Sequence, residues 1–402
     1  MVPKLGTETV RRSDNDQDLG GGTEWRLVKI AYLSNSVIPS RNASSIHVMK
    51  MCQALARIGH EVTLIALDGS SGREPGMENP YAFYGVDDIF GLRVVPPWRH
   101  FGQGWVYSWR LFKALRAARP DLVYGRNLRG CVLASVTGYP TVLELHTLNI
   151  LWTSYDRLMF LALRRSGSLR RIVVISERLK LDLLDAAPID ARSVLVAHDG
   201  ADLIRDHCRP PGLKQSATRL QVGYVGHIYP GRGLELILAL ARRLVDVDFH
   251  IVGGQAADIE RVRRLVVLPD NVVLHGFLPY VQAEAFRAHC DVLIAPYQRT
   301  VKTVGAGKTE TSRWMSPLKI FEYMAAGKPI LCSDLPVLRE ILEHERTAWL
   351  AAPDDEDAWV DAVTRLAGDT ELRRRLGEAA RQELTDKYTW RGRANHVLQG
   401  IS

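Results

Sequence analysis

The chain has 402 residues, which is too long for one small core and favours two or three domains. Hydrophobic residues at 46% and charged residues at 24% describe an ordinary soluble globular protein. The net charge of +7 suits an anionic substrate, an acidic membrane surface or nucleic acid. Nucleic acid is not expected, because no basic segment interleaves with aromatic residues and no zinc-finger spacing occurs.

The five cysteines stand apart from one another, and none belongs to a C-x-x-C pair. Most lie in apolar runs, where a free buried thiol is expected, so the sequence favours a reducing cytosol. The N-terminus lacks the apolar core of a secretory signal, and no run of 18 apolar residues occurs. We therefore expect a cytoplasmic protein, with at most peripheral contact with the inner face of a membrane.

The first half of the chain alternates strands and helices. Residues 1–24 are polar and end in a glycine run, which indicates a disordered leader. The expected strands are 28–33, 61–67, 92–95, 122–125, 141–146, 172–175 and 194–197. The expected helices include 46–58, 105–118 and 176–184, and Ser34–Ser45 is expected to form a loop. This alternation is typical of right-handed βαβ units and predicts a doubly wound, Rossmann-like domain over residues 25–205.

The second half repeats this organisation. Residues 206–218 are interrupted by prolines and a glycine and form the predicted linker. The expected strands are 220–226, 249–253, 272–276, 292–296, 330–332 and 347–350, with helices that include 234–245 and 283–289. The segment 300–313 has no period and is expected to be a mobile loop. A second Rossmann-like domain over residues 219–386 and a C-terminal helix over 387–402 complete the prediction. Two such domains can hold two substrates in a cleft between the carboxyl ends of their strands.

The most informative stretch runs from Ser316 to Pro329 and reads as a short helix with both ends marked. Ser316 is suited to cap the first amides, Pro317 to occupy the first helical position, and Gly327 to end the helix in the left-handed region. The start of such a helix presents unpaired N–H groups and the positive end of its dipole. It therefore favours a phosphate or another anion.

Glu322 lies a turn and a half inside this helix, and its side chain leans back toward the helix start. A carboxylate beside an anion site suits a pair of sugar hydroxyls, so the stretch predicts a nucleoside diphosphate site. The alternative is a surface ion pair between Lys319 and Glu322 at helical spacing, and spacing alone leaves both open.

Other chemistries find less support. The glycines of Gly223–Gly233 do not have the G-x-G-x-x-G spacing of a nicotinamide site. The motif Asp246-Val247-Asp248 has the Asp-x-Asp pattern of the metal site in other sugar transferases. It lies at an expected helix-to-strand junction, however, where helix capping and solubility explain the two aspartates better. No His, Cys and Asp cluster has metal-ligand spacing, so we expect no metal and no cofactor besides a co-substrate. Residues 105–116 mix aromatic and basic residues, and both a membrane-facing helix and a core-packed helix with a basic outer side stay open.

From about Val28 to its end the chain resembles retaining glycosyltransferase family 4, which has the GT-B fold. The stretch Ser316–Pro329 is similar to the donor-nucleotide signature of that family. In the signature the second of two glutamates separated by seven residues binds the ribose, and Glu322 matches it. The first glutamate would stand at position 314, where this chain has Trp314. The resemblance implies an α/β fold of two Rossmann-like domains with a cleft between them. It also implies a final helix, opened by 388–390, that crosses back to the first domain.

The resemblance also implies which residues bind the donor. Gly226-His227 and Arg232-Gly233 resemble the turn that holds the donor diphosphate, where cations suit the charge of the leaving group. Residues 277–279 resemble the segment whose backbone meets the base. The donor-binding residues implied are Gly226, His227, Arg232, Phe277, Leu278, Ser316, Pro317, Leu318, Lys319 and Glu322.

His146 closes an expected strand at its carboxyl end, and the resemblance implies that it lines the donor-sugar side of the cleft. Glu144 has the same strand parity and is placed to orient His146 or simply to pack beside it. The residues expected to act in catalysis are His146, Arg232 and Glu322. Those expected on the acceptor side are Arg41, Asn42, Ser44, Arg126 and Asn127.

Taken together, the resemblance implies a metal-independent retaining glycosyltransferase. It would move a sugar from a nucleotide-diphosphate donor to a hydroxyl acceptor, which would be a saccharide, a lipid-linked acceptor or a small natural product. Two other interpretations stay open. One is a catalytically silent or repurposed protein that binds a nucleotide, suggested by Trp314 and by the absence of glycine from Ser34–Ser45. The other is a GT-B sugar-nucleotide epimerase.

Overall fold

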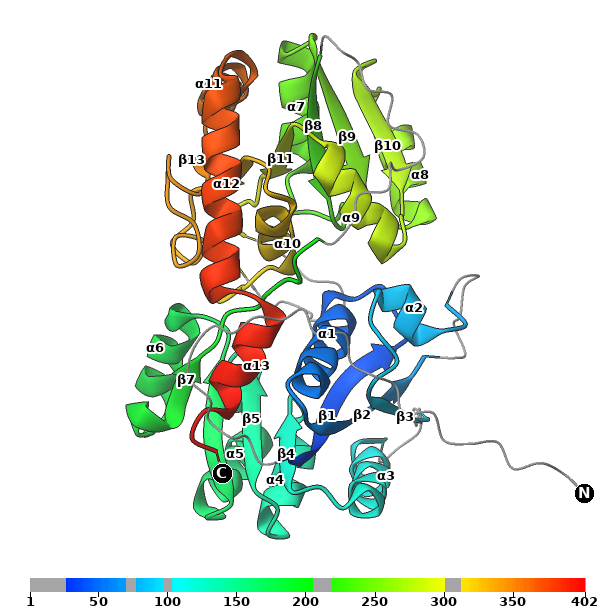
Figure 1. Ribbon diagram of the computed structural model, residues 1–402, viewed down its shortest axis with the longest axis vertical. Helices are drawn as coiled ribbons and strands as arrows, with labels where there is room; N and C mark the ends of the chain where they lie inside the picture. Colours follow the sequence, from blue (N-terminus) through cyan, green and yellow to red (C-terminus); the bar gives the residue numbers. More distant parts are fainter. Residues whose placement is uncertain (1–26, 70–76, 97–102, 205–218, 301–311, 402) are drawn as a thin grey trace, which may run out of the picture.

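The computed structural model describes residues 27–69, 77–96, 103–204, 219–300 and 312–401. The expected leader and linker, and most of the expected loop at 300–313, lie outside the described residues. The described chain forms two α/β units, one above the other in Figure 1, each built on its own parallel sheet.

The first unit contains a seven-stranded parallel sheet with the strand order β3-β2-β1-β4-β5-β6-β7. Its strands are β1 (Lys29–Ile38), β2 (Glu61–Asp68), β3 (Gly91–Val95), β4 (Leu122–Gly125), β5 (Thr141–Leu145), β6 (Leu169–Val174) and β7 (Val194–Val196). Its helices are α1 (Ala43–Arg57), α2 (Pro80–Tyr84), α3 (Gln103–Ala118), α4 (Leu128–Val136), α5 (Ser154–Arg165) and α6 (Glu177–Ala186). Every residue of β4 and β5 is buried, as expected for central strands covered by helices on both faces.

One expectation for this unit is wrong. The segment Ser34–Ser45 is not a loop, because β1 continues to Ile38 and α1 begins at Ala43. The hydroxyls of Ser34 and Ser36 hydrogen-bond to each other at 2.9 Å, which allows these polar residues to be buried within a strand. A serine-rich strand of this kind lacks the apolar pattern by which strands are recognised.

The second unit contains a six-stranded parallel sheet with the order β10-β9-β8-β11-β12-β13. Its strands are β8 (Leu220–Val225), β9 (Val247–Val252), β10 (Val272–Gly276), β11 (Val292–Ala295), β12 (Ile330–Ser333) and β13 (Trp349–Ala351). The helices of this half are α7 (Leu234–Arg243), α8 (Ala256–Leu265), α9 (Tyr280–His289), α10 (Leu318–Ala326), α11 (Glu356–Gly368), α12 (Thr370–Lys387) and α13 (Trp390–Leu398). The strand order reverses between β1 and β4 in one sheet and between β8 and β11 in the other. The expected doubly wound α/β architecture, GT-B, is confirmed.

The chain passes between the units twice. Residues 197–204 lead out of the first unit, and α13 returns to it after α12, as the red helix of Figure 1 shows. Ala201 N–H donates to the Tyr388 carbonyl at 3.1 Å where the two passages meet. Trp390, Ala394 and Val397 of α13 are buried in the core under α1, so the return of the final helix is confirmed.

The helix α3 packs its apolar side inward. Leu111, Ala114 and Leu115 are buried in the core of the first unit, whereas the Trp109 side chain is 62% exposed beside Lys113. This is the core-packed helix with a basic outer side. In the described parts of the chain, no helix is both long enough and apolar enough to cross a membrane.

Candidate active site

The helix α10 is present over Leu318–Ala326, and it ends as expected at Gly327 in the left-handed region, with φ of 63°. Its start differs from the prediction. Pro317 occupies the cap position, so Ser316 lies one residue too early to reach the helix amides. Ser316 Oγ instead accepts a hydrogen bond from Asp199 N–H of the first unit at 2.8 Å. The predicted cap is therefore wrong, and Ser316 joins α10 to the first unit.

Lys319 is buried, and its Nζ lies 3.9 Å from the ring centroid of Tyr224 and 5.1 Å from that of Tyr297. No described residue accepts a hydrogen bond from this ammonium group. Burial, followed by the charge of Arg232, holds the pKa of Lys319 well below its usual range. The surface pair of Lys319 with Glu322 is therefore ruled out.

The Lys319 ammonium points at the turn after β8. Gly226 has φ of 154°, which residues with a Cβ rarely adopt, and a Cβ atom there would lie 2.7 Å from Nζ, so the position favours glycine. Gly233, at the start of α7, has φ of 84°, and a Cβ there would lie 2.0 Å from the Pro296 carbonyl oxygen. These two glycines allow the turn to approach Lys319 and the end of β11 closely.

Arg232 lies in the same turn. Its guanidinium is 5.1 Å from the ring centroid of Tyr229 and 5.5 Å from that of Tyr297, and Nη2 donates to Tyr229 Oη at 3.1 Å. Its Nε is buried without a partner among the described residues. The His227 ring stacks on Tyr229, and burial followed by Arg232 lowers the pKa of His227. The structure thus brings together four predicted donor residues: Gly226, His227, Arg232 and Lys319.

Glu322 has a partner that sequence reasoning missed. Arg287 of α9 is buried, and its Nη1 lies 3.2 Å from Glu322 Oε2. The guanidinium is also 5.7 Å from the Tyr280 ring centroid, and Lys50 of the first unit lies 4.3 Å from the same ring. The signal in the sequence was an arginine on the apolar face of an amphipathic helix, beside the buried Phe286.

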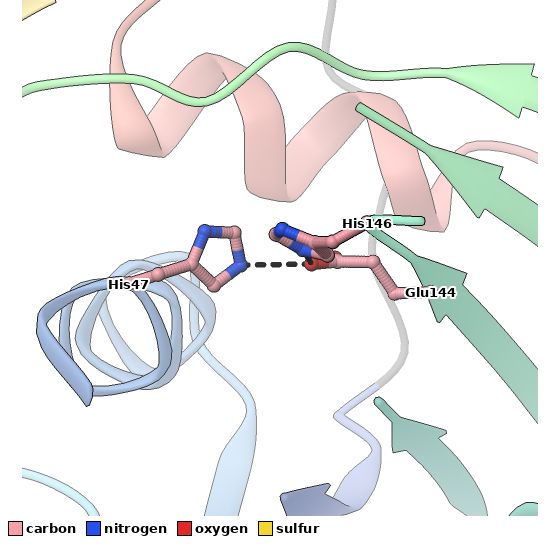
Figure 2. A group of neighbouring side chains, drawn as sticks. All are labelled: His47, Glu144 and His146. Carbon is pink, nitrogen blue, oxygen red and sulfur yellow. Dashed lines mark hydrogen bonds and ion pairs between the residues drawn. The ribbon is translucent and has the colours of Figure 1, made fainter. Parts of the chain in front are cut away.

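In the first unit, His146 directly follows β5, and its Nε2 lies 2.6 Å from Glu144 Oε1. Figure 2 shows that His47 of α1 reaches the same carboxylate, with Nε2 at 2.8 Å from Oε1. The second oxygen, Oε2, accepts from Tyr124 Oη and, at 3.0 Å, from Arg393 Nη2 of α13. The expected orientation of His146 by Glu144 is present, whereas nothing near His47 or Arg393 in the sequence pointed to this site.

Burial controls the protonation of this group. Burial, and then the charge of Arg126, lowers the pKa of His146 to about 4, although Glu144 opposes the shift. Burial alone would raise the pKa of Glu144, but Arg393 and His47 outweigh it and hold this pKa well below its usual range. At neutral pH the site therefore holds a neutral His146 beside an ionised Glu144.

The predicted acceptor-side residues do not form one group. Arg126 joins the cluster, with Nε 3.9 Å from Glu144 Oε1 and Nη1 3.5 Å from the Ser44 carbonyl oxygen. Asn127 is a helix cap, since its side chain accepts from Gly130 N–H at the start of α4. Its amide also donates to Asn35, so both of its polar ends serve the fold.

Asn42 is exposed at the start of α1 and caps nothing with its side chain. Arg41 lies 3.8 Å above the ring centroid of Phe277 in the second unit. The Phe277 ring also stacks with Phe83 of the first unit, with 6.1 Å between the ring centroids. Arg41 follows β1 and Phe277 follows β10, so the carboxyl edges of the two sheets face each other here.

Two residues near the donor helix, Leu318 and Trp314, connect the units. Leu318 packs into the core of the first unit, whereas Leu278 packs against the core of the second unit, to which it belongs. Trp314 packs against the cluster around α5 and α6, and its Nε1 donates to Asp182 Oδ2 at 2.6 Å. The Trp314 carbonyl accepts from Ser176 Oγ at 3.1 Å. Trp314 thus fastens the second unit to the first.

In the described parts of the chain, one group of side chains has the spacing of a metal site: His47, Glu144 and His146, whose ligand atoms lie within 4.8 Å of one another. The charges around it do not fit a divalent ion. Guanidinium groups of Arg393 and Arg126 lie 3.0 and 3.9 Å from the same carboxylate and already supply positive charge. In the Asp246-Val247-Asp248 motif, Asp248 has a structural role. At the start of β9 its carboxylate accepts hydrogen bonds from the side chains of Arg219 and Gln221.

Comparison with known proteins agrees with this architecture. Residues 44–205 match the family model described as Glycosyltransferase Family 4, and residues 219–369 match the one described as Glycosyl transferases group 1. A GDP-mannose-dependent alpha-mannosyltransferase of Mycolicibacterium smegmatis is 27% identical over 90% of this chain and 94% of that protein. An alpha-D-kanosaminyltransferase of Streptomyces kanamyceticus is 23% identical over 67% of this chain and 72% of that protein.

Solved structures share the fold. The Anabaena protein HepE in complex with UDP superposes with a TM-score of 0.68 at 16% identity, over 93% of this chain and 99% of that one. A sucrose-phosphate synthase from Thermosynechococcus elongatus superposes with a TM-score of 0.69 at 16% identity, over 93% and 98%.

Proposed function

Since the chain belongs to the glycosyltransferases of family 4, with a family model matched in each half, we propose that it transfers a sugar from a nucleoside diphosphate to a hydroxyl acceptor. We further propose that the transfer retains the anomeric configuration and needs no metal ion. The donor nucleotide would bind the second unit, and the acceptor would approach from the first.

The observation that carries the proposal is the pair of cations at the Gly226 turn. The Lys319 ammonium and the Arg232 Nε are both buried without a hydrogen-bond partner among the described residues. A buried ammonium without a partner is costly, and an anion that accepts its hydrogen bonds removes that cost. Lys319 lies in the first turn of α10, whose cap position, Pro317, supplies no side-chain cap, so amides at the helix start are suited to an anion. A diphosphate supplies the required charge and acceptor oxygens.

The chemistry follows from this placement. As the bond between sugar and diphosphate breaks, negative charge grows on the leaving oxygen, where Lys319 and Arg232 would stabilise it. Two fixed cations take the part that a divalent ion plays in other transferases, which supports catalysis without metal. Glu322, held by Arg287, would accept hydrogen bonds from the ribose hydroxyls.

Retention is supported by the first unit. An inverting transfer needs a general base, and Glu144 is already engaged by Arg393 and Tyr124. His146, with a pKa of about 4, is a weak base at neutral pH. We therefore propose that the acceptor attacks on the face of the leaving group and that the departing phosphate takes the acceptor proton.

The donor class follows from the relatives. One relative is named for GDP-mannose, and HepE has been solved with UDP-glucose, so we propose a nucleoside diphosphate hexose. A saccharide, a lipid-linked saccharide or a small natural product would be the acceptor. Four of the five cysteines are buried free thiols, which supports a reducing cytoplasm as the site of action.

The test is a screen of the purified chain against GDP- and UDP-hexoses, first by thermal shift and then by product analysis with and without acceptors. Binding of the donor should raise the unfolding temperature by mass action. Release of nucleoside diphosphate together with a glycosylated acceptor supports the proposal. A thermal shift without release from any donor indicates a silent binding protein, and conversion of donor without acceptor indicates an epimerase.

Retention is read from the anomeric configuration of the first product formed. Activity that survives a chelator supports metal independence. Lys319→Met should lose both the shift and the turnover, whereas Lys113→Met, which alters an outward-facing lysine of α3, should keep both.

A further inference from the structure

The side chain of His146 is one end of a chain of contacts that reaches the donor helix. His146 Nε2 lies 2.6 Å from Glu144 Oε1, and His47 Nε2 lies 2.8 Å from the same atom. His47 Nδ1 lies 2.9 Å from Asp199 Oδ1, and both His47 contacts are at ion-pair distance without the geometry of a hydrogen bond. Asp199 N–H donates to Ser316 Oγ, directly before α10. Four residues of the first unit thus connect the two proposed halves of the site.

The contact with Glu144 selects one form of the His146 ring. An ionised carboxylate can only accept hydrogen bonds, so the neutral imidazole facing it must carry its proton on Nε2. Its Nδ1 then has a free lone pair. Among the described residues none bonds to Nδ1, and 21% of the side chain is exposed. His146 is therefore set to accept a hydrogen bond from a hydroxyl group at Nδ1.

Glu144 stays ionised only because of its cationic neighbours. Arg393 of α13 donates to Glu144 Oε2 and, through Nε, to the His198 carbonyl at 2.9 Å. Each nitrogen of His47 faces a carboxylate oxygen, Nε2 that of Glu144 at 2.8 Å and Nδ1 that of Asp199 at 2.9 Å. His47 and Arg393 thus enclose the Glu144 carboxylate from α1 and α13.

We propose that Glu144 is the positioning residue that fixes the Nε2–H form of His146, and that Arg393 of the C-terminal helix and His47 hold Glu144 in place for this task. His146 would then accept a hydrogen bond from a donor-sugar hydroxyl through Nδ1. This role of His146 rests on the proposed transferase function. In this proposal α13 contributes to catalysis as well as to packing, because it brings Arg393 to Glu144.

The first test is Glu144→Gln in the full chain. A glutamine can turn either its oxygen or its NH₂ group toward His146, so the ring is no longer held in one form. We expect kcat to fall roughly a hundredfold, as for other small misplacements of an active-site group. The affinity for the free nucleoside diphosphate, measured by calorimetry with GDP and UDP, should not change, because the nucleotide would bind the second unit.

The ring form is read directly from the nitrogen chemical shifts of ¹⁵N-histidine-labelled protein, with His146→Gln assigning the signal. Wild-type protein should show the Nε2–H form alone, and Glu144→Gln a mixture of both. This readout needs no substrate. It therefore still tests the positioning role if the proposed transferase function fails, so the two failures can be distinguished.

Glu144→Gln leaves Arg393 buried without its carboxylate and threatens folding. The double variant Glu144→Gln/Arg393→Met removes both charges and should fold, yet keep the low kcat and the mixed ring form. Arg171→Met is the matched control: Arg171 also holds α13, through the carbonyls of Val397 and Gln399, but does not reach Glu144. It should keep the wild-type ring form and kcat.

Three results would overturn the proposal. The double variant could show wild-type kcat and a single ring form, or Arg171→Met could lower kcat as much as the double variant does. Alternatively, a chelator could abolish activity and Zn²⁺ restore it, which would make His47, Glu144 and His146 a metal site.

Discussion

The two sides of the proposed site treat their central buried charges in opposite ways. In the second unit, Lys319 Nζ and Arg232 Nε are buried without hydrogen-bond partners among the described residues. In the first unit, Glu144 is engaged by Arg393, Tyr124 and two histidines. Unsatisfied cations cost stability and are kept where an anion binds, whereas a fully engaged carboxylate has no capacity left for a ligand and can only position its neighbours. We therefore interpret the second unit as the binding side and the first as the positioning side.

The largest expected effect is a difference in the free energy of unfolding: removing a buried cation should destabilise the protein on the positioning side but not on the binding side. Arg393→Met leaves Glu144 buried without its main cation and should lower the free energy of unfolding by about 3–5 kcal/mol. Lys319→Met removes a buried ammonium that has no described partner, so it should leave the free energy of unfolding unchanged or raise it. Urea denaturation of both variants measures the difference, and equal losses would refute the comparison.

The second prediction concerns donor binding. Lys319→Met should lower kcat/KM for the donor roughly a hundredfold or more, since it removes one group that stabilises the leaving diphosphate. Arg232→Lys keeps the positive charge but loses the planar guanidinium that can bind two phosphate oxygens. Its kcat/KM for the donor should lie between those of Lys319→Met and the wild type. Calorimetry with GDP and UDP measures the binding part. Unchanged affinity in both variants would move the diphosphate away from this turn.

A third prediction tests Glu322 against one part of the ligand. Glu322→Ala should weaken binding of a ribonucleoside diphosphate by roughly tenfold or more, since charge-assisted hydrogen bonds contribute about 1.5–3 kcal/mol. The 2′,3′-dideoxy analogue lacks both hydroxyls, so its binding should not depend on Glu322. Arg287→Met should reproduce the selective loss, because Arg287 holds the carboxylate. A loss of equal size with both ligands would show that Glu322 acts on the structure of the site and not on the ribose.

The same comparison explains which parts of the site could be read from the sequence. The donor side depends on local signals, such as glycines at a turn and proline and glycine at the ends of α10. The positioning side depends on residues far apart in the chain, since Arg393 and Glu144 are 249 positions apart. Neither His47 nor Arg393 has a neighbour in sequence that marks its partner, so only the fold reveals them.

The fold itself was largely predictable, because apolar runs bounded by turn residues mark the strands of both parallel sheets. The exception, the extension of β1 through Ser34 and Ser36, is stabilised by hydrogen bonds between hydroxyls that no hydrophobic pattern records. Ser316 is a similar case. A serine is a residue type that often caps helices, but here Pro317 occupies the cap position. The Ser316 hydroxyl instead accepts a hydrogen bond from Asp199 N–H.

The fourth prediction concerns Trp314, which stands where the family signature has a glutamate. Trp314→Phe keeps most of the packing and removes the hydrogen bond to Asp182, so it should lower the free energy of unfolding by about 1 kcal/mol. Trp314→Glu restores the signature but places a carboxylate beside Asp182 and removes an aromatic ring from the contact with the first unit. We expect it to destabilise the protein more and to give no gain in kcat. A gain in kcat would mean that position 314 can reach the donor sugar.

The last prediction concerns pH and lies outside both sides of the site. Burial, and then the charge of His275, lowers the pKa of His250 to about 4. Unfolded His250 takes up a proton below pH 6.5 while the folded residue does not until about pH 4, so the unfolded state binds more protons in this window. The free energy of unfolding should therefore fall with decreasing pH by roughly 1.4 kcal/mol per pH unit from this residue alone. In His250→Gln, urea denaturation at several pH values between 4 and 6.5 should show a dependence shallower by that amount. His396→Gln, which alters an exposed histidine of α13, should keep the wild-type dependence. If both variants keep it, His250 is not held neutral by the fold.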